Sequence, residues 1–136
     1  MYDTSLTRQS LPSEQYRLLL GTAVCVFSSN NAFLIENILR VDDSVSWFEL
    51  IDKTAGAVRS VADGKLPEEI ICLFTDIIKM RNRIIHGFRI TNSKGEQSIA
   101  TKEKTGCQFE ITEEYLKEFI RKNEKLSDQL HAFRGF

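Results

Sequence analysis

Apolar residues along most of this chain recur every three or four positions, which is the spacing of one face of an α-helix. We expect a first helix over residues 12–40, with a kink or break at the polar run of residues 28–31. The same spacing predicts a second helix over residues 46–64 and a third over residues 67–87. Each of the three opens with a serine or proline that is typical of a helix start.

The spacing changes after Gly87. Residues 88–111 alternate between apolar and polar positions and carry turn residues at 92–95 and 105–106, which predicts two or three short strands. Helical spacing returns over residues 112–134. The expected fold class is therefore mainly α: a bundle of four to five helices with a short β-hairpin inserted before the C-terminal helix.

Length and composition favour one soluble domain. The chain has 136 residues, of which 42% are hydrophobic and 27% are charged, and we expect a single domain over residues 1–136 with residues 1–11 as a flexible N-terminal arm. No apolar run approaches the ~20 residues of a membrane span. Cys25 and Cys72 are expected to be buried, reduced thiols, and no CxxC pair or His/Cys cluster predicts a metal or a cofactor. We expect a cytoplasmic protein with no membrane partner.

Basic residues are concentrated in one region, although the net charge is only −1. This near-neutral balance argues against a protein that coats nucleic acid non-specifically. Between Asp76 and Glu96 the chain has no acidic residue but five basic ones: Lys79, Arg81, Arg83, Arg89 and Lys94. A solvated helix face followed by a charged hairpin tip would give the same pattern.

The third helix has two apolar faces on a helical wheel. The face expected in the core carries Leu73, Ile77, Met80 and Ile84. The face expected in solvent carries Asp76, Lys79 and Arg83. The second apolar face carries Phe74, Ile78, Arg81, Asn82, Ile85 and His86. A helix with two apolar faces is usually buried on both. Either another helix of the chain or a second copy of the protein covers the second face, and in the second case Phe74, Ile78 and Ile85 form a dimer interface.

The sequence RNRIIH at residues 81–86 resembles the R-[N/D/H]-x-x-x-H motif of the HEPN superfamily of small all-α domains. The motif lies near the end of a late helix and is followed by Gly87, as is common in that family. The resemblance covers residues 74–88 in sequence and the whole chain in architecture. It implies a two-fold dimer, a metal-independent ribonuclease and a role in toxin–antitoxin or phage-defence systems, with an antitoxin or a larger defence complex as a further partner.

The resemblance also implies a role for each motif residue. Arg81 and His86 from two copies line one composite cleft, where histidine moves protons near neutral pH and arginine holds phosphate oxygens. Asn82 orients His86 or the phosphate. Single-stranded RNA supplies its own nucleophile, the 2′-hydroxyl. Residues Lys79, Arg83 and Arg89 are candidates for contacting the RNA backbone, with a solvated charge as the alternative for each.

One branch of the family carries a tyrosine two residues after the histidine, where it is adenylylated. Phe88 holds that position here, so control by adenylylation at this site is not expected.

Three functional hypotheses follow from these observations. The first is a homodimeric HEPN endoribonuclease. The second is a HEPN-fold dimer without catalysis that binds RNA, a nucleotide or a protein partner through the same cleft. The third is a helical interaction module unrelated to that family.

Overall fold

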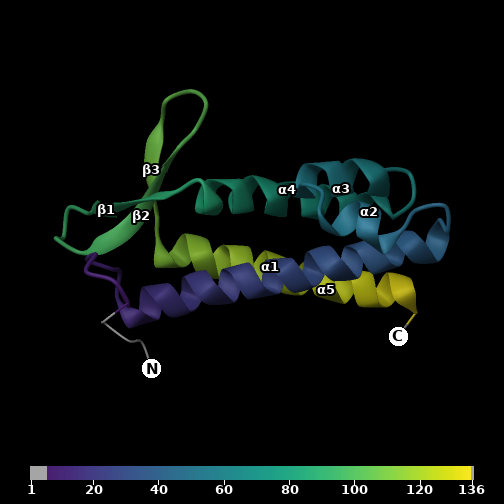
Figure 1. Cartoon of the computed structure of the whole chain (residues 1–136), viewed down its shortest axis with the longest axis horizontal. Helices are drawn as coiled ribbons and strands as arrows, with labels where there is room; N and C mark the ends of the chain where they lie inside the picture. Colours follow the sequence, from purple (N-terminus) through teal and green to yellow (C-terminus); the bar gives the residue numbers. More distant parts are fainter. Residues whose placement is uncertain (1–5, 136) are drawn as a thin grey trace.

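The computed structural model describes residues 6–135 and confirms a mainly helical fold with a small antiparallel sheet (Figure 1). Its elements, in chain order, are α1 (Glu14–Val41), α2 (Trp47–Ile51), α3 (Ala55–Ala62), α4 (Glu68–Ile85), β1 (Phe88–Thr91), β2 (Gln97–Lys102), β3 (Gln108–Ile111) and α5 (Glu113–Arg134). The predicted arm lies partly outside the described residues, and residues 7–13 form neither a helix nor a strand.

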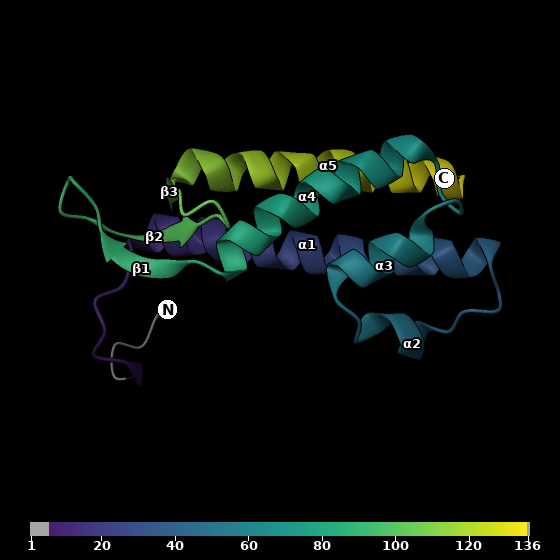
Figure 2. The ribbon, with the colours of Figure 1, turned by 90° about the horizontal axis from the view of Figure 1, so that it is seen from above.

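Three long helices enclose the core. Helices α1 and α5 lie side by side and run in the same direction, while α4 crosses over them in the opposite direction (Figures 1 and 2). The ring of Phe27 on α1 stacks against Phe74 on α4 and Phe119 on α5, with 6.2 Å between ring centres in both pairs. Aromatic rings bury large apolar areas, so this cluster ties the three helices together at their centre.

The break predicted at residues 28–31 is wrong, because α1 is continuous through them. The amide Nδ2 of Asn30 donates hydrogen bonds to the carbonyl oxygen of Asn123 at 2.7 Å and to its side-chain Oδ1 at 3.0 Å. Asn123 in turn donates to the carbonyl of Phe119 at 2.9 Å. Two buried amides that pair across α1 and α5 stabilise the helix more than the weak propensity of serine and asparagine destabilises it.

The single helix predicted over residues 46–64 is instead two helices, α2 and α3, separated at residues 52–54. The hydroxyl of Thr54 accepts a hydrogen bond from the amide of Ala57 at 3.2 Å. Threonine at this position is an N-cap, which starts a new helix in a new direction. Residues 53–55, at and just before the start of α3, lie near residues of α1 and α4.

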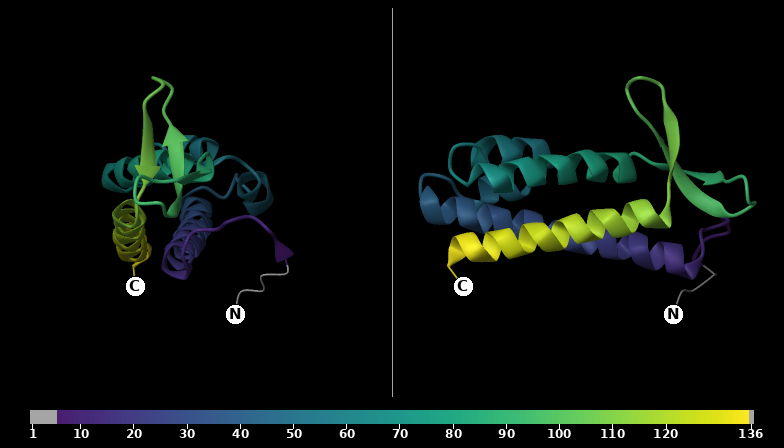
Figure 3. Two further views of the ribbon diagram at one scale, coloured as in Figure 1. Left: turned by 90° about the vertical axis from the view of Figure 1, so that its left-hand side faces the viewer. Right: turned by 180° about the vertical axis from the view of Figure 1, so that it is seen from behind.

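The three strands form one sheet in the order β1-β2-β3, with both pairs antiparallel, at the end of the molecule where α1 and α5 begin (Figure 3). The Tyr16 hydroxyl joins this sheet to α1. It donates to the carbonyl of Ile111 and accepts from the amide of Ile99 at 3.2 Å. The predicted hairpin is therefore a three-stranded sheet.

Two other expectations need correction. Cys25 and Cys72 are exposed rather than buried, because both lie on the outer sides of their helices. Helix α1 is also long and apolar enough to cross a membrane. This is weak support for a membrane span, because a core helix of a soluble protein passes the same test. Helix α1 packs against α2, α3 and α5 and, through the Phe27–Phe74 ring pair, against α4.

Candidate functional site

The motif arginine lies in the interior of the helical layer. Arg81 is half-buried on α4, and its guanidinium carbon lies 5.1 Å from the centre of the Phe27 ring. A guanidinium above an aromatic face is held by cation–π attraction. Its Nη1 also donates to the Oδ1 of Asn82 at 3.4 Å. These contacts fix the planar donor group of Arg81 between α1 and α4.

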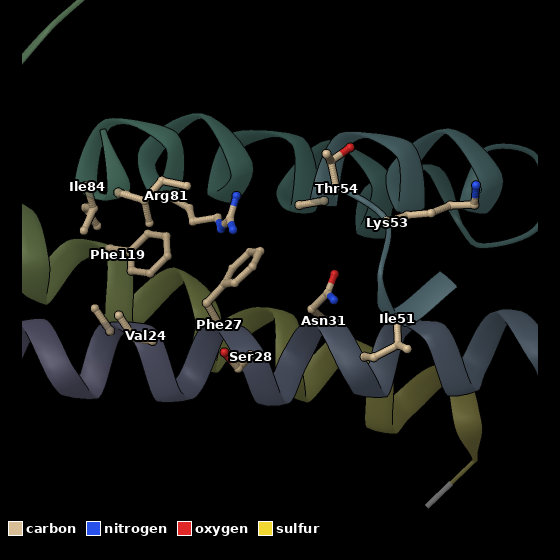
Figure 4. Close-up of a pocket in the computed structure, with 13 residues that line it drawn as sticks. Val24, Phe27, Ser28, Asn31, Ile51, Lys53, Thr54, Arg81, Ile84 and Phe119 are labelled. Carbon is tan, nitrogen blue, oxygen red and sulfur yellow. The ribbon is translucent and has the colours of Figure 1, made fainter. Parts of the chain in front are cut away.

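Arg81 points into a cavity of about 310 Å³ that lies between α1, α4 and the start of α3 (Figure 4). One side of this cavity is apolar and is formed by Val24, Ile84 and Phe119. On the other side of Arg81 lie Asn31, Thr54 and Lys53. None of the described residues that line the cavity is acidic. The cavity therefore combines apolar walls with positive charge, which suits a ligand that has both an apolar and an anionic part.

His86 lies outside this cavity. It is the C-cap of α4, where its backbone amide donates to the carbonyls of Asn82 and Ile84, and its side chain is exposed. The next two apolar residues along the surface are also exposed, Ile85 by 46% and Phe88 by 43%. Within one copy of the chain, the structure does not bring Arg81 and His86 into one cavity.

The predicted solvent position of Arg83 is wrong. Arg83 is half-buried, and its Nη1 donates to the carbonyl oxygen of Lys102 at the end of β2. The helical wheel placed Arg83 in solvent because it contains no information about the sheet that folds back against the end of α4. Arg83 has a structural partner, so this residue is a poor candidate for holding RNA.

The other two candidate RNA contacts are on the surface. Lys79 is exposed on α4. Arg89 is exposed on β1, and its Nη1 donates to Oε1 of Gln97 on the neighbouring strand. Both positions are accessible to a polyanion, and an exposed charge of this kind contributes little to stability.

The predicted dimer interface is only partly accessible. Phe74 is 0% exposed and stacks on Phe27, so it cannot contact a second copy. Ile78 is half-buried and packs against the core of its own chain. Only Ile85 is exposed as the prediction requires. The second apolar face of α4 is therefore covered mainly by α1 and α5.

Sequence reasoning missed the residues opposite Arg81. Asn31 belongs to the polar run of residues 28–31 that predicts a break in the first helix, and the predicted second helix includes Lys53 and Thr54. Thr54 does carry a signal that could have revealed the break, since threonine before a short helix is a common N-cap. No such signal marks Asn31, whose role depends on what packs across from it.

No group of three or more histidine, cysteine, aspartate or glutamate side chains in residues 6–135 is arranged to hold a metal ion. In comparisons with known proteins, no family model, no curated protein and no solved structure matches this chain.

Proposed function

We propose that this protein is a metal-independent endoribonuclease that acts as a homodimer through its Arg81 and His86 residues. The observation that carries the proposal is the end of α4, where the exposed His86 lies between the exposed apolar residues Ile85 and Phe88. Exposed apolar side chains suit a contact with another protein molecule. Such a contact would leave the imidazole of His86 in a cleft from which water is partly excluded.

A two-fold contact at this end of α4 uses the same patch twice. It would bring the histidine of one copy near the arginine of the other, which a single copy does not achieve. The mainly helical fold and the resemblance of residues 81–86 to the HEPN motif support this arrangement. The resemblance also favours a toxin or phage-defence role, with an antitoxin or defence complex as a partner.

The proposed chemistry uses the RNA as its own nucleophile. His86 takes the proton of a 2′-hydroxyl, and the 2′-oxygen attacks the adjacent phosphorus while the bond to the 5′-oxygen breaks. The histidine of the second copy protonates the leaving oxygen. Arg81 stabilises the negative charge on the phosphate oxygens. The products are a 2′,3′-cyclic phosphate and a 5′-hydroxyl, and DNA is not cut because it lacks the 2′-hydroxyl.

The test is cleavage of labelled single-stranded RNA by the purified protein in EDTA. His86→Ala and Arg81→Ala should each lower the rate by ~10²-fold or more, the loss expected for a proton-transfer group or an oxyanion-stabilising charge. His131→Ala and Arg121→Ala are matched controls, since both residues are exposed on α5 and should leave the rate unchanged.

Cleavage that survives His86→Ala would contradict the proposed catalytic role. A clean dimer that binds RNA but cuts none of a varied set would favour the non-catalytic dimer instead.

A further inference from the structure

The cavity beside Arg81 has a feature that the cleavage chemistry does not use. Asn31 lies half-buried between Arg81 and Lys53, and its side-chain amide points from α1 toward α4 and the start of α3 (Figure 4). Its Oδ1 is inaccessible to solvent and has no hydrogen-bond partner among the described residues. A buried polar atom without a partner costs free energy, so a ligand that pairs with this amide would recover it.

An amide side chain is well suited to reading a base. It offers one donor and one acceptor in a plane, and each nucleobase presents donors and acceptors along its edge. Because no hydrogen bond in the described chain fixes its Oδ1, the Asn31 amide can turn to match a bound edge. The Arg81 guanidinium, which lies over the ring of the buried Phe27, supplies a planar surface, and unpaired bases stack on such groups.

Positive groups lie on both sides of Asn31. Arg81 lies on one side and Lys53 on the other, and α3 begins beside Lys53 with Thr54 and Ala55 in the cavity wall. The start of a helix carries a partial positive charge and amide groups without intrahelical acceptors. A nucleotide within a strand has a phosphate on each side, whereas a free nucleoside monophosphate has only one.

We propose that this cavity binds one unpaired nucleotide of an RNA strand, with Asn31 reading the edge of its base. Arg81 holds the phosphate on the side nearer His86, and Lys53 with the start of α3 holds the phosphate on the other side. Asn31 is thus a specificity-determining residue. The choice of RNA as the ligand rests on the proposed function, while the cavity and its charges do not.

The experiment measures binding without cleavage. The probe is a labelled single strand of uridines with one variable base at its centre, and every 2′-hydroxyl is methylated so that the strand cannot be cut. The wild-type protein should prefer one of the four central bases in fluorescence anisotropy. Asn31→Ala should abolish this preference and lower the best affinity by about tenfold, as for one lost amide–base pair.

A variant of the same shape gives a sharper result. Asn31→Asp replaces the donor with a second acceptor, so the preference should move toward guanine, whose Watson–Crick edge presents two adjacent donors. Ser29→Ala is the control, because Ser29 is exposed on the same helix and does not line the cavity. It should leave the preference unchanged.

A second pair of variants blocks the cavity without touching Asn31. Val24 is an exposed residue at its wall, so Val24→Trp should weaken binding of all four strands. Leu18→Trp places the same ring on an exposed part of α1 outside the cavity and should have no effect.

Equal binding of the four strands that neither Asn31→Ala nor Val24→Trp alters, or no binding at all, overturns the nucleotide subsite. Displacement of the strands by an equal concentration of a free nucleoside monophosphate assigns the cavity to free nucleotides and overturns the choice of RNA. Binding that depends on Asn31, without cleavage of unmodified RNA, supports the subsite and contradicts the ribonuclease. Cleavage that depends on His86, without any effect of Asn31 or Val24 substitutions, supports the ribonuclease and contradicts the subsite.

Discussion

At the scale of single residues, Gly87 fixes the turn that separates α4 from the sheet. A Cβ atom at this position would lie 2.2 Å from Cγ2 of Ile99, 3.1 Å from the carbonyl oxygen of Ile84 and 3.2 Å from that of Ala100. The sequence predicted that Gly87 ends the helix, and the structure adds the reason. The Ile99 side chain and the Ala100 carbonyl of β2 approach so closely that there is no room for a side chain at residue 87.

We predict that Gly87→Ala destabilises the protein by roughly 1–3 kcal/mol, the usual cost of overpacking. Gly21→Ala makes the same chemical change on α1, where an added Cβ meets nothing within 4 Å. It should stabilise the protein by about 0.5–1 kcal/mol, because alanine favours a helix over glycine. Urea unfolding of the two variants gives both values. A Gly87→Ala protein as stable as the wild type would refute the close approach.

At the scale of elements, Tyr16 holds α1 to the sheet through its bonds to Ile99 and Ile111. Burial raises the pKa of its hydroxyl above the ordinary value of 10.0; the hydrogen bond from Ile99 opposes this, and Glu110 and Glu113 add to the increase. The neutral, protonated form is therefore favoured by folding. The contribution of the Tyr16 hydroxyl to stability is complete below the pKa of tyrosine in the unfolded state. This contribution is lost as the pH rises through the higher pKa of the folded state.

We predict that the free energy of unfolding falls as the pH rises above about 10, the ordinary tyrosine pKa. Tyr16→Phe should lower the free energy of unfolding by roughly 1–3 kcal/mol at neutral pH, because it leaves the buried carbonyl of Ile111 and the part-buried amide of Ile99 without this partner. The same substitution should also make the decrease in the free energy of unfolding at alkaline pH smaller. Urea titrations at several pH values measure both effects.

Tyr115→Phe is the comparison. Burial also raises the pKa of Tyr115, but its hydroxyl donates only one long bond, of 3.5 Å, to the carbonyl of Met80. Tyr115→Phe should therefore lower the free energy of unfolding at neutral pH by less than Tyr16→Phe does. An equal loss from the two variants would argue against the bridging role of Tyr16.

Local signals predicted the elements that depend on local contacts. The helices predicted to open at residues 12 and 112 begin at Ser13 and Thr112. Each hydroxyl accepts a hydrogen bond from the backbone amide three residues later, at 3.1 Å. The continuity of α1 depends instead on the pairing of Asn30 with Asn123. That partner is 93 residues away in the sequence, so the pattern around Asn30 could not indicate it.

The same limit explains what could be predicted of the site. The motif spacing identified Arg81, Asn82 and His86 as candidates, but it could not tell which groups face them. Periodicity shows that Phe74 is on an apolar face, and only packing shows that α1 rather than a second copy covers it. The cavity was not predicted because four separate segments of the chain form it.

At the scale of the whole molecule, the proposal requires self-association through the end of α4. We predict that Ile85→Glu converts a dimer into a folded monomer, because it places a charge in the contact. This variant is more informative than Ile78→Glu, since Ile78 packs against its own core and the change would also destabilise the fold. Light scattering measures the mass and circular dichroism the helix content.

Leu18→Glu is the control for this substitution. It introduces the same charge at an exposed apolar position of α1 that does not line the Arg81 cavity, so the dimer should persist. A wild-type protein that is monomeric at all accessible concentrations would exclude the composite cleft.

The partnership of α1 with α5 also has a consequence for synthesis of the chain. Asn30 on α1 bonds to Asn123 on α5, 93 positions later, so α1 leaves the ribosome long before the helix that covers it. The chain is synthesised at ~5–20 residues per second, so the apolar side of α1 stays uncovered for roughly 5–20 s until α5 has been made. During that interval the nascent chain exposes the most apolar of the three long helices. This order of appearance makes the unfinished polypeptide, rather than the folded product, the form most in need of chaperone protection.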